Sequence, residues 1–200
     1  MIYFANKKIC FMEKPKCGST SLNKALSKQA GSKTIGKGIP VCKNHEDINY
    51  KHANLNSCVR KLKQLGLNYK KFTFLAILRE PVDLVSSMFF YEKNHMKRNN
   101  EYFQFNTLDE MMNTVHYQYF VDSNYFNNKY NVDLATFTLD KLNIMVEYLK
   151  INFNIKLQIE KLNTRKKHQT LNLSSTQKKQ IEKDFYLYYE VNNGNIKRKT

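Results

Sequence analysis

The feature of the sequence that most restricts the fold is the run FTFLAIL, residues 72–78, in which all but one position is apolar. A continuous apolar run of this length is typical of a strand buried on both faces of a parallel sheet. The run ends at residues 79–81 (REP), and apolar Val85, Met88 and Phe89 then predict a helix that begins at the proline. This segment is therefore predicted to be a strand–loop–helix unit.

The start of the chain shows a second unit of this kind. Residues 8–13 (KICFME) predict a short strand, the residues KPKCGS follow as a loop, and Leu22, Ala25 and Leu26 have the spacing of a helix. Strands that alternate with helices are typical of α/β proteins with a largely parallel sheet. Ligands of such sheets bind beyond the carboxyl ends of the strands, which is where both loops are expected to lie.

The rest of the pattern completes one domain over residues 1–200. We expect an α/β fold with three layers, a mostly parallel central sheet and a P-loop-like phosphate-binding strand–loop–helix, and a frayed tail at 191–200. Pairs typical of a capping box are Thr107 with Glu110 and Ser174 with Gln177. The further elements predicted from the spacing of apolar residues are helices at 55–65, 107–119, 142–149 and 174–188 and a strand at 132–139.

The formal net charge of +16 indicates an anionic partner, which a nucleic acid, an acidic glycan or a phosphate-rich cofactor would each provide. No helix-turn-helix, zinc-finger or RNA-binding motif stands out, which disfavours a nucleic acid. Cys10, Cys17, Cys42 and Cys58 form no CxxC pair, so we expect reduced thiols and no metal site. The chain has neither a run of about 18 apolar residues nor a signal-peptide layout, so we expect a cytoplasmic protein with no membrane span.

The loop KPKCGSTSL, residues 14–22, has the composition of an anion-binding site. The N-terminus of a helix presents backbone N–H groups and the positive end of its dipole, and Gly18 lets a ligand approach the backbone closely. Three hydroxyl residues follow the glycine, and Lys16 adds a positive charge. The loop is not a Walker A motif, because that motif places its lysine after the second glycine. Taken alone, the segment equally fits a helix start with a hydroxyl cap.

Arg79 and Ser87 offer a second set of phosphate ligands. In the segment LREPVDLVSSMFFYE the arginine stands at a predicted strand end, and the serine follows eight residues later on the next helix. A guanidinium and a hydroxyl at these positions can share one phosphate, and the fork of an arginine suits two phosphate oxygens. The alternative for Arg79 is a surface ion pair with Glu80 or Asp83.

Together the two segments resemble the sulfotransferase family, which uses 3′-phosphoadenosine-5′-phosphosulfate (PAPS) and releases 3′-phosphoadenosine-5′-phosphate (PAP). PKCGSTSL is similar to the family's 5′-phosphosulfate loop, a Pro-Lys-x-Gly-[Ser/Thr]-[Ser/Thr] run after the first strand. LREPVDLVSSMFF is similar to its 3′-phosphate segment. The chain looks closest to the carbohydrate branch, in particular the heparan sulfate 2-O-sulfotransferase-like enzymes.

This resemblance implies a role for each matching residue. Lys16 would contact the oxygen that bridges sulfur and phosphorus, residues 18–20 would cradle the 5′-phosphate, and Arg79 and Ser87 would bind the 3′-phosphate. The basic stretch 162–168 would either close over the donor or remain a solvated loop. The cofactor-binding residues that the match implies are Lys14, Pro15, Lys16, Cys17, Gly18, Ser19, Thr20, Ser21, Arg79, Ser87, Arg165 and Lys166.

Sulfuryl transfer is an in-line displacement at sulfur, and a hydroxyl acceptor needs a general base, usually a histidine or a carboxylate. The scheme requires no metal. The base is expected between the two motifs, where the candidates are His45, Glu46, Asp47 and His52. His52 directly precedes an amphipathic helix, as a histidine does in the branch that the chain resembles, so we expect His52 as the base and His45 as the second candidate. The expected acceptor is a carbohydrate hydroxyl.

The sequence also departs from the family pattern. Leu84 stands where many relatives carry a second arginine, and the short chain leaves less sequence for an acceptor-binding wall. Two other functions remain open. One is a nucleotide-binding protein that keeps the phosphate loops without transferase activity. The other is a basic nucleic-acid-binding protein, whose binding would depend on salt but not on Lys16 or Arg79.

Overall fold

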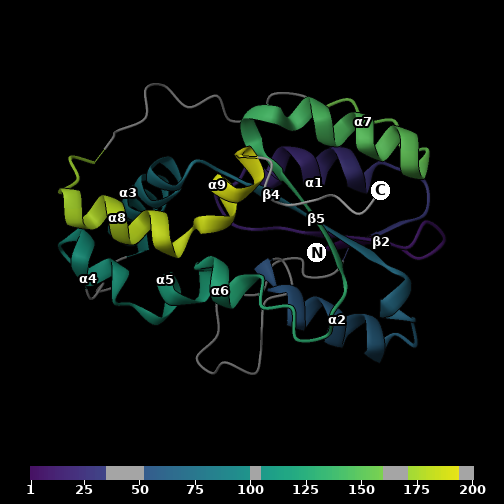
Figure 1. Ribbon diagram of the computed structural model, residues 1–200, viewed down its shortest axis with the longest axis horizontal. Helices are drawn as coiled ribbons and strands as arrows, with labels where there is room; N and C mark the ends of the chain where they lie inside the picture. Colours follow the sequence, from purple (N-terminus) through teal and green to yellow (C-terminus); the bar gives the residue numbers. More distant parts are fainter. Residues whose placement is uncertain (35–51, 100–104, 160–170, 194–200) are drawn as a thin grey trace.

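The structure is a computed structural model that describes residues 1–34, 52–99, 105–159 and 171–193. At its centre lies a five-stranded open sheet (Figure 1), in the order β3 (Ser32–Thr34), β1 (Ile2–Phe4), β2 (Ile9–Met12), β4 (Thr73–Leu78) and β5 (Asp133–Thr138). β4 pairs parallel with β2 and with β5, while β1 pairs antiparallel with β2 and with β3. The α/β class and the mostly parallel sheet predicted from the sequence are confirmed.

β4 explains why residues 72–78 are almost wholly apolar. The strand has a parallel neighbour on each side, and every one of its residues after Thr73 is buried. Its neighbour β2 is buried throughout. Met12 lies opposite Ala76, and Leu78 lies opposite Thr138, so β2, β4 and β5 end at the same edge of the sheet. The loops that follow these strands therefore meet there, as expected for a parallel sheet.

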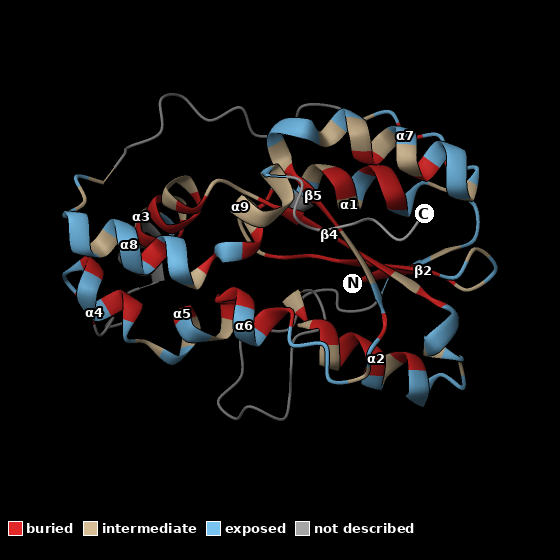
Figure 2. Cartoon of the chain, in the orientation of Figure 1, coloured by how far each residue is buried: buried red, intermediate tan, exposed pale blue. Residues whose placement is uncertain are grey.

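Helices cover both faces of the sheet (Figure 1). α1 (Ser19–Ser27) and α7 (Leu142–Phe153) lie on one face, where α1 packs against β1 and β3 and α7 packs against β5. α2 (Leu55–Gln64) lies on the other face against β2. Figure 2 shows buried residues along the strands and on the sides of these helices that face them. This burial of apolar surface is the main force that holds the layers together.

A second group of helices lies beyond the carboxyl edge of the sheet (Figure 1). In this group α3 packs against α8, and α9 packs against the end of β5. Two short 3-10 turns flank the strands, η2 (Tyr69–Lys71) before β4 and η3 (Leu139–Lys141) after β5. The helices of this group are α3 (Pro81–Asn99), α4 (Leu108–Met112), α5 (Val115–Phe120), α6 (Asp122–Tyr125), α8 (Ser175–Asp184) and α9 (Tyr186–Asn192).

Two predicted helices are each broken into two. The helix predicted at 107–119 ends at Met112, because Thr114 Oγ1 accepts a hydrogen bond from the Tyr117 N–H and caps a new helix. The helix predicted at 174–188 breaks at Phe185, whose φ of −121° is not helical. The capping box of Ser174 and Gln177 is confirmed.

The short strands β1 and β3 were not predicted, because three residues carry too little pattern to reveal a strand. Within the described ranges, no helix has the length and apolar character needed to cross a membrane. In the same part of the chain, no three His, Cys, Asp or Glu side chains are grouped so that they could hold a metal ion.

Candidate functional site

The loop between β2 and α1 turns sharply twice before the helix begins. Lys16 and Gly18 both have left-handed backbone conformations, with φ of 62° and 70°. Gly18 is the N-cap of α1, so no side-chain oxygen is present at the cap, and the first turn contains no acidic residue. By contrast, α2 is capped by Asn54 and α8 by Ser174. The start of α1 thus presents N–H groups and a positive dipole end with no capping side chain of its own at Gly18.

Leu139, the first residue after β5, packs against this loop at Gly18. A Cβ atom added to Gly18 would lie 2.7 Å from Leu139 Cδ1, which is closer than two carbon atoms approach without a shift. Two constraints therefore favour glycine at position 18: the left-handed φ and the packing of Leu139. The close approach also ties η3 to the start of α1.

Arg79 joins the two sequence segments that were predicted to bind phosphate. It follows β4 directly, and its Nη1 donates a hydrogen bond of 3.1 Å to the carbonyl oxygen of Lys16, across 63 positions of sequence. Its Nη2 lies 3.8 Å from the Asp83 carboxylate, so the surface pair considered for Arg79 is present as well, at long range. The Arg79 side chain is only 12% exposed. The two predicted segments therefore do lie side by side.

Beyond Arg79, one face of α3 lies along this loop. Asp83, Ser87 and Tyr91 follow at intervals of four residues, which places them on the same side of the helix. Tyr91 lies beneath the Lys16 ammonium, with Nζ 4.0 Å from the ring centroid. Lys16 thus contacts this face through its carbonyl near Arg79 and through its ammonium at Tyr91. Half-buried Ser87 lies between these two contacts along the helix.

The start of α3 is satisfied differently from the start of α1. The Glu80 carboxylate accepts hydrogen bonds from the N–H groups of Val82 and Asp83, at 3.1 and 2.7 Å. A protein carboxylate therefore already interacts with the positive end of this helix. An incoming phosphate would find that position taken, whereas the first turn of α1 contains no acidic residue.

Lys14 does not face a ligand. It is buried, its Nζ lies 2.6 Å from Asp122 Oδ1, and the other Asp122 oxygen accepts a hydrogen bond from the Leu187 N–H. The rings of Tyr125, Phe126 and Phe185 surround the ammonium at 4.9 to 5.5 Å. The match to the family motif implied a donor contact for Lys14. The structure gives it an internal carboxylate instead, which anchors the loop to α6 and to the start of α9.

The other predicted cofactor residues differ in exposure. Cys17 is buried, and burial raises the pKa of its thiol to about 11, so the thiol stays neutral near pH 7. Thr20 is exposed, and Pro15 and Ser21 are half-buried. The side chain of Ser19 and the residues Arg165 and Lys166 lie outside the described residues.

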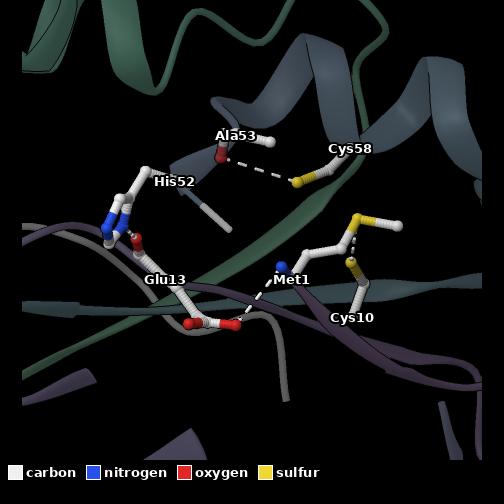
Figure 3. A network of polar contacts seen from close by, with 6 residues as sticks. All are labelled: Met1, Cys10, Glu13, His52, Ala53 and Cys58. Atoms are coloured by element: carbon white, nitrogen blue, oxygen red, sulfur yellow. Dashed lines mark hydrogen bonds and ion pairs between the residues drawn. The ribbon is translucent and has the colours of Figure 1, made fainter. Parts of the chain in front are cut away.

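His52, the predicted base, is tied to the residue that precedes the loop. Its Nδ1 lies 2.7 Å from the Glu13 carbonyl oxygen (Figure 3). A carbonyl oxygen only accepts, so a neutral His52 carries its proton on Nδ1 and its lone pair on Nε2. Tyr119 fixes the same segment, because its hydroxyl accepts from the Asn54 N–H and donates to the His52 carbonyl. The second candidate base, His45, lies outside the described residues.

Sequence reasoning missed three residues that support the site. Glu13 bonds His52 through its carbonyl, while its buried carboxylate points toward the Met1 amino group at 3.2 Å (Figure 3). Asp122 holds Lys14. For Tyr91 the sequence offers only a weak signal, its aromatic side chain one helical turn after Ser87. No protein-family model, curated protein or solved structure matches this chain.

Proposed function

We propose that this protein is a sulfotransferase that moves the sulfuryl group of PAPS to an acceptor hydroxyl, with the strand–loop–helix of β2 and α1 as a P-loop-like phosphate site. The observation that carries the proposal is the contact between Arg79 and the Lys16 carbonyl. It brings the two segments with phosphate-binding composition to one edge of the sheet, where parallel sheets bind ligands.

The residues at this edge fit an anionic donor. α1 opens with glycine at its cap and without an acidic residue, next to the Lys16 and Arg79 cations. Such a helix start favours a phosphate or sulfate. Lys16 and Arg79 provide two cations at this edge, which fits PAPS, a ligand with anionic groups at both the 3′ and the 5′ position of its ribose. The resemblance to the carbohydrate branch supports a carbohydrate acceptor.

In the proposed reaction PAPS supplies the sulfuryl group and a phosphate leaving group. The N–H groups at the start of α1 and the Lys16 ammonium bind the anionic end of the donor and stabilise the charge that develops there. Arg79 and Ser87 bind the second phosphate. His52 Nε2 accepts the proton of the acceptor hydroxyl, while the Nδ1 contact with the Glu13 carbonyl holds the ring in the required tautomer.

Replacing His52 with alanine tests whether the site is catalytic. We expect turnover to fall by about 10²–10⁴-fold, the usual contribution of a general base, while PAP binds within about twofold of wild type. The measurement is transfer of radiolabelled sulfuryl groups from PAPS to a panel of polysaccharides, beside calorimetric titration with PAP. The control is His116→Ala, since His116 pairs with Glu92 and is 39% exposed.

Unchanged turnover in His52→Ala would remove this residue from the mechanism. A wild-type protein that binds PAP but transfers to no acceptor on the panel would favour the alternative of a non-catalytic nucleotide-binding protein.

A further inference from the structure

We infer that Tyr91 is a positioning residue for the Lys16 ammonium, because its ring holds the cation beside the start of α1 so that the loop is ready for an anion. The inference rests on the proposed function in so far as that anion belongs to PAPS. It gives a role to a residue of α3 that is not among the predicted phosphate ligands and that acts through Lys16.

The backbone of Lys16 has an unusual conformation and is held by a hydrogen bond from Arg79. Its φ of 62° is unusual for a residue with a side chain, and its carbonyl oxygen accepts the Arg79 hydrogen bond. A lysine side chain on a fixed backbone still has several rotatable bonds, and ordering it carries an entropic cost. The contact with Tyr91 at 4.0 Å orders the ammonium before a ligand arrives.

An aromatic ring holds a cation in a different way from a carboxylate. The ring attracts the ammonium through its quadrupole and adds no formal charge, whereas a carboxylate at the same place would neutralise the lysine. The same loop shows the contrast, because Lys14 is paired with the Asp122 carboxylate and serves as an internal anchor. A ring therefore orders a lysine without adding a negative charge that would weaken its attraction for an anion, whatever else the lysine contacts.

The position of Tyr91 matches this role. Tyr91 is 39% exposed and lies one helical turn beyond Ser87, on the face of α3 that Lys16 contacts. A ring placed there keeps the ammonium on the side of the loop where Arg79 and Ser87 lie. Cation–π contacts at exposed sites are weak enough for the ammonium to move toward a ligand phosphate.

The test is a substitution series at Tyr91 with PAP and inorganic pyrophosphate as probes, titrated by calorimetry at low salt. Tyr91→Phe keeps the ring and is expected to bind both probes within about twofold of wild type. Tyr91→Leu is expected to bind them about twofold to fivefold more weakly. Tyr91→Glu, which adds a negative charge beside the ammonium, is expected to bind more weakly than Tyr91→Leu.

A double-mutant cycle separates positioning from a merely structural role. In a Lys16→Met background Tyr91→Leu should change the affinity for either probe by less than about 1.5-fold, because no ammonium remains to be positioned. The matched control is Tyr130→Leu, since the Tyr130 ring lies under Lys63 at 4.5 Å near the opposite end of β5. It should leave both affinities unchanged.

The outcomes distinguish the positioning role of Tyr91 from the PAPS assignment. If wild type binds pyrophosphate through Lys16 but shows no preference for PAP, and the series holds, the positioning role stands while the PAPS assignment fails. If Tyr91→Leu binds like wild type, or weakens binding equally with and without Lys16, the positioning role is overturned. Failure of wild type to bind either probe would overturn both.

Discussion

Replacing Lys14 with methionine is expected to lower the free energy of unfolding by about 3–5 kcal/mol, the cost of removing one partner from a buried ion pair. Both side chains of the pair with Asp122 are 1% exposed, and Nζ and Oδ1 are 2.6 Å apart. Without the ammonium, Asp122 keeps the Leu187 N–H but has lost the charge that compensates its own. The carboxylate must then be buried unpaired or take up a proton.

Urea unfolding followed by circular dichroism measures this change. The double variant Lys14→Met/Asp122→Asn removes both charges, keeps an oxygen for the Leu187 N–H, and should recover most of the lost stability. The control is Lys150→Met, because Lys150 and Glu147 form a pair in which each partner is more than half exposed. That change should cost less than about 1 kcal/mol. If Lys14→Met and Lys150→Met were equally stable, the buried pair would not anchor the loop.

Replacing Arg79 with alanine is expected to weaken PAP binding by about 10²–10⁴-fold, which corresponds to the loss of two charge-assisted hydrogen bonds. The same change removes the donor from the Lys16 carbonyl, so the loop also loses its link to β4. Arg79→Lys should fall between alanine and wild type, because an ammonium keeps the charge but not the fork. Calorimetric titration with PAP measures all three proteins.

Arg60 provides the matched control for Arg79. It lies on α2, on the face of the sheet opposite α1, and its Nη2 donates to Ser57 Oγ at 3.1 Å. Arg60→Ala should bind PAP within about twofold of wild type, since a single surface charge outside the site is largely screened by salt. Equal affinities for Arg79→Ala and wild type would exclude Arg79 from the phosphate site.

The sequence was sufficient to predict the centre of the fold. The apolar run of β4 has one common explanation, a strand buried on both faces, and two strand–loop–helix units in a parallel sheet must end at one edge. The same logic predicts that Gly18 and Arg79 lie at the same edge. The short edge strands β1 and β3 escaped prediction, because their pairing depends on tertiary contacts.

The supporting residues of the site could not be predicted in the same way. A lysine between a strand and a glycine loop is normally exposed, and only the distant Asp122 and its aromatic neighbours explain the burial of Lys14. The contact between Tyr91 and Lys16 and the contact between His52 and the Glu13 carbonyl each join segments far apart in the sequence. Local pattern carries no signal for such pairs.

The proposed function requires that the edge formed by the loop and Arg79 binds a ligand with phosphates at both the 3′ and the 5′ position of its ribose. The most direct measurement is the thermal unfolding temperature of the wild-type protein with PAP, AMP or ATP at equal concentrations. A ligand that binds only the folded state raises this temperature by mass action. We expect a clear increase with PAP and little or none with AMP or ATP. No increase with PAP, or an equal increase with ATP, would contradict the account.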